Sequence, residues 1–99
     1  MKIFISQPMF GKTDEQIRQE REELIKQIEE DGNEYLDSIV ADGLEEVNND
    51  SIGLFYLGKS LEIMSKADEV WFMNGWDKSR GCKIEYQVAK DYNKKIVEL

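Results

Sequence analysis

The segment from Trp76 to Glu85 holds the residues of this chain that are best suited to chemistry on a small ligand. It follows an apolar run, Val70–Met73, and leads into a segment with helical periodicity. A loop that joins the carboxyl end of a strand to a helix is where open α/β sheets bind ligands. The loop carries an arginine and a serine, and a carboxylate follows in the first turns of the helix. The segment therefore suits a sugar-phosphate ligand whose reactive carbon lies near Glu85.

Glu85 itself has two interpretations. As a functional residue, it attacks an anomeric carbon and stabilises oxocarbenium character, or it binds ribose hydroxyls. As a structural residue, it is a surface carboxylate that favours the positive end of a helix dipole. Glu85 neighbours the apolar stripe of Ile84 and Val88 without lying on it, so the periodicity leaves both interpretations open.

Ser79, Arg80 and Gly81 form a second candidate group. Backbone N–H groups at a helix N-terminus bind anions together with a guanidinium, although an ordinary helix start capped by Ser79 fits the same sequence. Trp76, in the same loop, suits stacking on a base or filling a subunit interface. The helix N-terminus and Arg80 would lower the pKa of the Cys82 thiol, but a buried, inert side chain is the interpretation that we favour.

Further candidates follow the other predicted strands. The loop after the first strand, from Ser6 to Gly11, can wrap a ligand with backbone amides and a hydroxyl, or it is only a turn closed by Pro8 and Gly11. Asp37 ends the second strand, where a carboxylate often binds ribose hydroxyls, or it is a plain loop residue. Asp68 is typical of a turn between a helix and a strand.

Apolar runs predict four strands, and amphipathic runs predict three helices. The predicted strands are Lys2–Ser6, Tyr35–Val40, Glu69–Met73 and Lys95–Val97. The predicted helices run from the N-cap Thr13 to Gly32-Asn33, from Asp50 or Ser51 to Lys66, and from Gly81 to Tyr92, with an acidic loop at Ala41–Asp50. Their apolar stripes are Ile17, Leu24, Ile25 and Ile28; Leu54, Leu57, Leu61 and Met64; and Ile84, Val88 and Tyr92. Gln16, three residues after Thr13, completes a capping box.

This order of elements predicts a parallel four-stranded sheet covered on both faces. Right-handed crossovers then give a small flavodoxin-like, Rossmann-type α/β three-layer sandwich with strand order 2-1-3-4. The point at which the strand order reverses, where such sheets bind ligands, lies between the first and third strands. The loops Ser6–Lys12 and Asn74–Arg80 would therefore border the same crevice, which places the candidate site.

Composition excludes several other classes of protein. The 99 residues (1–99) predict a single domain, and the net charge of −8 argues against a nucleic-acid polymer or an anionic membrane as partner. With no histidine and one cysteine, we expect no metal site and no disulfide, which fits the cytoplasm. We expect no signal peptide and no membrane-spanning segment. The sequence also holds no glycine-rich phosphate loop and no dinucleotide-binding motif, so we expect no cofactor.

Taken in order, these motifs resemble the nucleoside 2-deoxyribosyltransferase-like proteins, above all the small members found in phages, prophages and Gram-positive bacteria. The resemblance spans nearly the whole chain. It is carried by Met1–Met9 with Gly11, Tyr56–Ser60, Ala67-Asp68 and Gly75–Glu85.

The resemblance implies roles for individual residues. In the characterised enzymes, a glutamate on the helix after the third strand attacks the anomeric carbon and releases the base, and Glu85 matches its position. The implied pocket residues of the first loop are Ser6, Gln7, Met9 and Gly11. The implied anion- or sugar-binding segment is Ser79, Arg80 and Gly81.

Two positions depart from the transferase pattern. A base-contacting aspartate of the family falls near Ser60 here, and an acidic residue before the nucleophile is replaced by Ser79. These departures resemble the branch of nucleoside-monophosphate hydrolases, in which serines hold a 5′-phosphate. We therefore expect Ser60, Ser79 and Arg80 to hold phosphate or sugar.

The expected activity is cleavage or transfer at the N-glycosidic bond of a (deoxy)nucleoside or its 5′-monophosphate. Glu85 is the expected nucleophile, and Asp37 or Asp68 assists protonation of the leaving base. Water or a second base then resolves the intermediate with retention of configuration. The alternatives are a module that binds a nucleotide or an NAD-derived metabolite without turnover, and a structural or interaction domain. A homo-oligomer is expected because nucleoside 2-deoxyribosyltransferase-like proteins commonly complete their pockets across a dimer interface.

Overall fold

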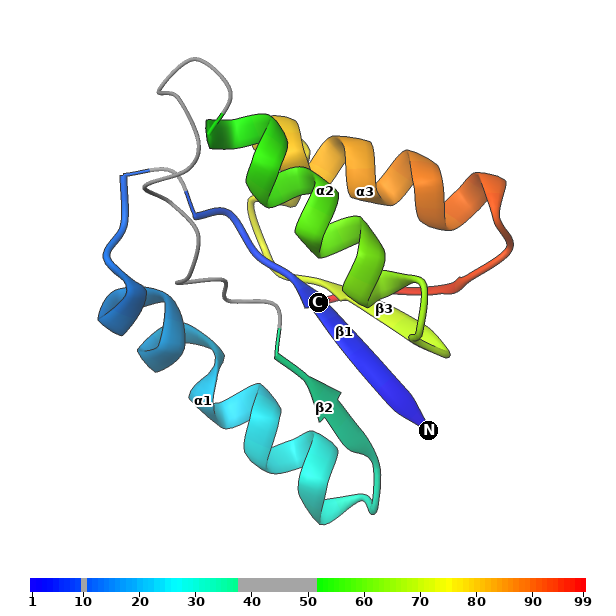
Figure 1. Cartoon of the computed structure of the whole chain (residues 1–99). Coiled ribbons are helices and arrows are strands. Elements are labelled where there is room, and N and C mark those ends of the chain that lie inside the picture. The colour runs from blue at the N-terminus through cyan, green and yellow to red at the C-terminus, as the bar shows by residue number, and fades with distance from the viewer. Residues whose placement is uncertain (10, 38–51) are drawn as a thin grey trace.

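The structure is a computed structural model that describes residues 1–9, 11–37 and 52–99. Figure 1 shows how its elements follow one another along the chain. The strands are β1 (Lys2–Ser6), β2 (Glu34–Leu36), β3 (Glu69–Phe72) and β4 (Lys95–Glu98). The helices are α1 (Asp14–Glu30), α2 (Ile52–Met64), the short 3-10 helix η3 (Trp76–Lys78) and α3 (Arg80–Asp91). None of the described helices is long and apolar enough to cross a membrane.

The four strands form one parallel sheet in the order β2-β1-β3-β4, as the sequence predicted. Ser6 at the end of β1 is paired with Phe72, and Phe72 with Glu98, so the carboxyl ends of these strands meet at one edge. Every residue of β3 is buried, which is the pattern of a strand covered on both faces. The carboxyl edge is where the ligand site of such a sheet is expected.

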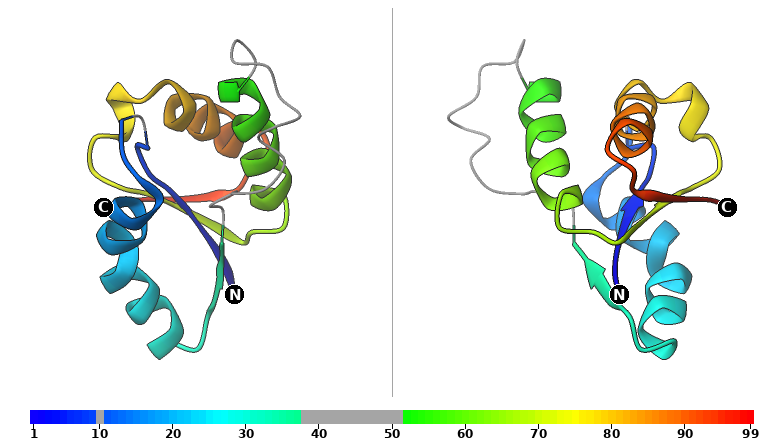
Figure 2. Two further views of the ribbon diagram at one scale, coloured as in Figure 1. Left: turned by 60° about the vertical axis from the view of Figure 1, so that its left-hand side comes forward. Right: turned by 90° about the vertical axis from the view of Figure 1, so that its right-hand side faces the viewer.

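Helices cover both faces of the sheet. Because side chains alternate along a strand, Ile3 and Ile5 face α1 and its Ile28, whereas Phe4 faces α2 and α3. In both views of Figure 2, α1 and α2 lie on opposite sides of β1. The result is a three-layer α/β sandwich, and Trp71 and Phe72 of β3 belong to its core.

Helix α1 begins and ends where its sequence signals predict. The Thr13 side chain accepts a hydrogen bond from the Gln16 N–H at 3.1 Å, and the Gln16 side chain accepts one from the Thr13 N–H at 2.9 Å. This reciprocal capping box satisfies two of the free donors at the helix start. After Asp31, Gly32 adopts a φ of +79°, the left-handed conformation that terminates helices.

The apolar stripe predicted for α3 is wrong in part. Ile84 and Tyr92 are 38% and 76% exposed, whereas the buried residues are Cys82, Glu85 and Ala89. Cys82 and Ala89 are small, so α3 can approach the sheet closely along them. The longer side chains of Ile84 and Tyr92 therefore turn outward.

On α2, Leu54 is 72% exposed, contrary to its predicted place on the buried stripe. Met64 is buried there as predicted, and Leu61 packs partly buried beside it. Helix α2 ends at Met64, two residues before the predicted end at Lys66. The predicted strand end at 38–40, the acidic loop Ala41–Asp50 and the cap at Asp50 or Ser51 lie outside the described residues.

Candidate functional site

Glu85 lies at the carboxyl edge of the sheet, beside the end of β1. Its side chain is on the buried face of α3, and the residue is only 7% exposed. The Ser6 hydroxyl donates a hydrogen bond of 2.7 Å to Glu85 Oε1. The structure therefore brings together two candidate residues that are 79 positions apart in the sequence.

Burial sets the protonation of this carboxyl. Desolvation is the largest influence and raises the pKa of Glu85 to about 7, while the Ser6 hydrogen bond and the positive charge of Arg21 act to lower it. A carboxyl poised near neutral pH changes charge under the conditions in which most enzymes work. Its ionised form is more basic than that of an ordinary glutamate, which strengthens it as a base or nucleophile.

Cys82 lies one turn before Glu85 on the same face of α3. Burial raises the pKa of its thiol, with smaller opposing effects from the Ser6 and Ser79 hydroxyls. A thiol with a raised pKa stays protonated and unreactive at neutral pH. The structure thus agrees with the inert interpretation of Cys82.

The N-terminus of α3 faces the same edge. Ser79 is the N-cap of the helix, and its hydroxyl accepts a hydrogen bond of 3.4 Å from the Cys82 N–H. Arg80 is exposed, and its guanidinium lies against the first turn of α2: a Cβ added at Gly53 would lie 3.2 Å from Arg80 Nη2. Ser79, Arg80 and Gly81 are therefore grouped at one helix start, as an anion site requires.

Trp76 belongs to an aromatic cluster beside this helix start. Its ring stacks on the Tyr86 ring at 4.2 Å between centroids with 9° between the planes. Phe72 packs against both rings, at 5.5 Å from Trp76 and 5.1 Å from Tyr86. One face of the half-buried Trp76 is thus covered by Tyr86, so a base could stack only on its other face.

The loops after β1 and β3 are neighbours, as the fold prediction required. The Met73 N–H donates to the Ser6 carbonyl at 3.0 Å, and a Cβ on Gly75 would lie 3.7 Å from Pro8 Cγ. The Met9 carbonyl accepts from the Lys12 N–H at 3.1 Å and closes a turn in which Gly11 has a φ of +78°. Ser6, Gln7 and Met9 therefore leave β1 beside the segment that leads into α3.

Gln7 points to the opposite face of the sheet from Ser6. Its amide donates to the Ile17 carbonyl at 3.1 Å and to Glu20 Oε1 at 2.7 Å. Its carbonyl oxygen accepts a 2.7 Å hydrogen bond from Nε of the buried Arg21. A Gln7 held this way anchors the loop after β1 to α1.

The remaining three candidates lie elsewhere. Asp37 follows β2 at the carboxyl edge, and one of its interactions is an ion pair of 3.4 Å with Arg18, in which both side chains are about half exposed. Asp68 accepts a 2.7 Å hydrogen bond from the Lys2 N–H at the start of β1, about 13 Å from Ser6 along the strand. Ser60 is half-buried on α2, about 10 Å along the helix from Gly53. The structure does not bring Asp68 to Glu85.

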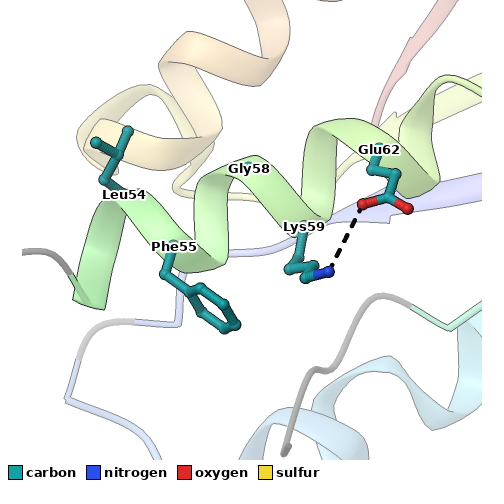
Figure 3. A pocket seen from close by; sticks show the side chains of 5 residues that line it. All are labelled: Leu54, Phe55, Gly58, Lys59 and Glu62. Atoms are coloured by element: carbon teal, nitrogen blue, oxygen red, sulfur yellow. Dashed lines mark ion pairs between the residues drawn. The ribbon is translucent and has the colours of Figure 1, made fainter. Parts of the chain in front are cut away.

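Of the hollows on the described surface, two lie on the helices α2 and α1, and neither of these two is lined by Glu85. The first, of about 400 Å³, lies along α2, and Figure 3 shows its five lining residues with the ion pair of 3.8 Å between Lys59 and Glu62. The second, of about 390 Å³, lies between Gly11 and the first turns of α1. No group of three His, Cys, Asp or Glu side chains suited to a metal ion occurs within residues 1–9, 11–37 and 52–99.

Sequence reasoning missed two members of this region. Arg21 is fully buried on α1, and Tyr86 supports Trp76. Arg21 did carry a signal, because it stands four residues after Ile17 and seven before Ile28, on the buried stripe itself. A charged residue at such a position predicts a buried polar contact. Tyr86 had no comparable signal, since its stacking depends on the path of η3.

Comparison with known proteins gives a family and no activity. Residues 1–98 match the sequence model of a family described as a domain of unknown function, DUF4406. No curated protein matches the chain. No solved structure matches it either.

Proposed function

The chain belongs to the DUF4406 family, and we propose that it cleaves or transfers the N-glycosidic bond of a (deoxy)nucleoside or nucleoside 5′-monophosphate, with Glu85 as nucleophile. One observation carries the proposal. A carboxyl with a pKa near 7 is buried at the carboxyl edge of a parallel sheet and held by a hydroxyl from the neighbouring strand end. The resemblance to nucleoside 2-deoxyribosyltransferase-like proteins supplies the substrate class.

In the proposed reaction, the Glu85 carboxylate attacks C1′ of the sugar. The C1′–N bond breaks, the base leaves with its electron pair, and a proton from Asp37 or from water neutralises the base. The product is an ester between the sugar and Glu85. Water then attacks C1′ and releases the free sugar, or a second base attacks and forms a new nucleoside. Two displacements at one carbon give net retention of configuration.

The start of α3 is the proposed binding site for the phosphate or the sugar hydroxyls. Its free N–H groups, the Ser79 hydroxyl and the exposed Arg80 guanidinium offer donors of the kind that phosphates need. Glu85 lies five residues further along, about 7 to 8 Å down the helix axis. That spacing is comparable to the length of a sugar 5′-phosphate. Trp76 is the proposed contact for the base, through the ring face that Tyr86 does not cover.

Asp68 is left out of the proposed site because it lies at the amino edge of the sheet, and Gln7 acts through the loop that it anchors. Ser60 stays a proposed contact for the phosphate or the sugar. We further propose that a second copy of the chain closes the pocket, as in the resembling enzymes. Light scattering of the purified chain, which separates a mass of 11.6 kDa from its multiples, tests the second copy directly.

The experiment for the activity is a panel of nucleosides and 5′-monophosphates, with the released base separated by chromatography. Wild-type chain is expected to release base, and Glu85→Gln is expected to lose at least about 1000-fold in rate. Glu62→Gln, an exposed glutamate on α2, serves as the matched control and is expected to retain the rate. Absence of base release by the wild type across the panel would refute the proposal.

The pH profile separates a nucleophile from a proton donor. A nucleophilic Glu85 must be ionised, so the rate is expected to rise with pH through a midpoint near 7 and then level off. A rate that falls with rising pH through that midpoint would instead assign Glu85 as a general acid.

The burial of Glu85 favours a second function, nucleotide binding without turnover. The residue is only 7% exposed, and its Oε1 is already bonded to Ser6, whereas Arg80 at the start of α3 is exposed. Calorimetry followed by recovery of the ligand distinguishes the two functions. Intact ligand bound equally well by wild type and Glu85→Gln would assign the chain as a binding module.

A further inference from the structure

Arg21 is a charged residue in the interior of the molecule. It lies on α1, facing the sheet, and it is 0% exposed. Removing a guanidinium from water costs free energy unless the protein offsets it with hydrogen bonds and favourable electrostatic interactions. A residue of this kind in a 99-residue domain therefore invites a functional explanation.

The contacts of Arg21 converge on the end of β1 and on β2. Its Nε donates to Gln7 Oε1 at 2.7 Å, and its Nη1 donates to the Tyr35 hydroxyl at 2.6 Å. The guanidinium carbon also lies 5.9 Å from the centroid of the Tyr35 ring. Such short hydrogen bonds from a charged donor fix the Gln7 side chain firmly.

Gln7 is joined by one peptide bond to Ser6, which holds Glu85. Because side chains alternate along an extended chain, Ser6 points toward α3 and Gln7 toward α1. Two neighbouring residues at the end of β1 thus connect a buried arginine on one face of the sheet with a buried glutamate on the other. The connection passes through the backbone rather than through an ion pair.

We propose that Arg21 is a positioning residue for the chemistry at Glu85: through Gln7 it fixes the strand end that presents the Ser6 hydroxyl, and its buried charge favours the ionised carboxylate. The catalytic role of Arg21 rests on the proposed function. The coupling of Arg21 to Glu85 across the sheet does not, because it is measurable on the ligand-free protein.

The groups around Glu85 point to Arg21 as the source of the charge effect. Within the described residues, the groups that interact electrostatically with it are Cys82 on α3, the Ser6 hydroxyl on β1 and, across the sheet, Arg21 on α1. On β3 and β4, Glu69 and Lys95 form an ion pair of 3.2 Å at the amino edge. The charged pair on α2 lies on its outer face (Figure 3). Positive charge from Arg21 lowers the pKa of Glu85, against desolvation.

The test is a carboxyl NMR titration of Glu85 in the ligand-free chain. Arg21→Met keeps the length and the apolar part of the side chain and removes the charge, so the Glu85 pKa is expected to move upward by about half a unit or more. Lys26→Met removes a positive charge from the exposed face of the same helix and is expected to shift that pKa by less than about 0.2 unit, because solvent screens it. Equal midpoints in the wild type and in Arg21→Met would overturn the charge effect.

Arg21→Lys tests the positioning effect and covers the case in which Arg21→Met does not fold. It keeps the charge but loses the planar fork that holds Gln7 and Tyr35. The Glu85 pKa is expected to stay within about 0.3 unit of the wild type, whereas the Met73 amide, which donates to the Ser6 carbonyl, is expected to exchange about tenfold faster. A raised pKa in Arg21→Lys contradicts the charge effect, and unchanged Met73 exchange contradicts the positioning effect.

These outcomes are independent of the outcome for the proposed function. A shifted Glu85 pKa in a chain that releases no base leaves the coupling intact and refutes only the activity. Base release with an unmoved pKa keeps the activity and refutes only the role of Arg21. In an active chain, Arg21→Met is further expected to move the midpoint of the pH–rate profile by the same amount as the NMR midpoint.

Discussion

At the scale of single residues, the Glu85 carboxyl is a source of instability as well as a candidate nucleophile. Its pKa is raised from 4.5 to about 7, so the folded chain holds a proton that the unfolded chain releases between these values. Below pH 4.5 the carboxyl is neutral in both states and burial costs little. As the pH rises through 7, the folded chain must bury a charge, and stability is lost.

Glu85→Gln should therefore stabilise the chain at high pH only. With about 1.4 kcal/mol for each pKa unit, the expected gain in the free energy of unfolding is about 2 to 3 kcal/mol at pH 8 and close to zero at pH 4.5. The amide oxygen still accepts the Ser6 hydrogen bond. Urea unfolding at the two pH values measures the gain, and Glu23→Gln, on the exposed face of α1, is the control. The same gain at both pH values would show that folding does not raise the pKa of Glu85.

The residues of the site differ in how far the sequence could predict them. Glu85 and Ser6 were chosen as candidates because each follows or ends a predicted strand, yet only the fold brings them within 2.7 Å. Arg21 was overlooked because charges on an amphipathic helix usually face solvent. Its place on the buried stripe indicates a polar contact, but the partners, Gln7 just after β1 and Tyr35 on β2, come from separate parts of the chain, so no local pattern identifies them.

At the scale of elements, local signals predicted helix ends better than helix faces. The Thr13–Gln16 capping box and Gly32 fix the ends of α1 through contacts within three or four residues. The buried face of α3 instead depends on the sheet: small Cys82 and Ala89 pack against it, and apolar Ile84 turns outward. Periodicity predicts that apolar side chains face the sheet, whereas close packing also requires that the side chains at the contact have the right size.

Two glycines of α2 allow a matched test of how α2 supports Arg80. A Cβ at Gly58 meets no atom within 4 Å, so Gly58→Ala is expected to stabilise the chain by about 0.5 to 1 kcal/mol through helix propensity alone. At Gly53 the same Cβ lies 3.2 Å from Arg80 Nη2, which must shift by a few tenths of an ångström. Gly53→Ala is therefore expected to gain less stability and to weaken phosphate binding severalfold.

Thermal unfolding and calorimetry with inorganic phosphate compare the two variants. Gly58→Ala should bind phosphate as the wild type does, because Gly58 lies in the hollow along the outer face of α2 (Figure 3). Equal phosphate affinity in both variants would show that Arg80 does not depend on the space that Gly53 leaves open.

At the scale of the whole molecule, the sheet order was predictable because few topologies satisfy alternating strands and helices with right-handed crossovers. Because all the strands are parallel, the sheet has a carboxyl edge and an amino edge with different residues. At the carboxyl edge lie Ser6, Glu85 and the start of α3. At the amino edge, Asp68 is tied to Lys2 by two hydrogen bonds of 2.7 Å, one from the Lys2 N–H to its carboxylate and one from its own N–H to the Lys2 carbonyl. The role of Asp68 there is to align β1 with β3.

This separation predicts that the two ends behave independently. Asp68→Ala removes the acceptor of the Lys2 N–H and is expected to lower the free energy of unfolding by about 1 kcal/mol, because the bond is exposed to solvent. Asp68 lies about 13 Å from Ser6, beyond the reach of direct coupling. The Glu85 pKa should therefore be unchanged in Asp68→Ala, and the unfolding effects of Asp68→Ala and Glu85→Gln should add within about 0.5 kcal/mol in the double variant. A Glu85 midpoint that moves in Asp68→Ala, or a clear departure from additivity, would mean that strand alignment at the amino edge controls the carboxyl edge, and Asp68 would then return to the candidate site as a positioning residue.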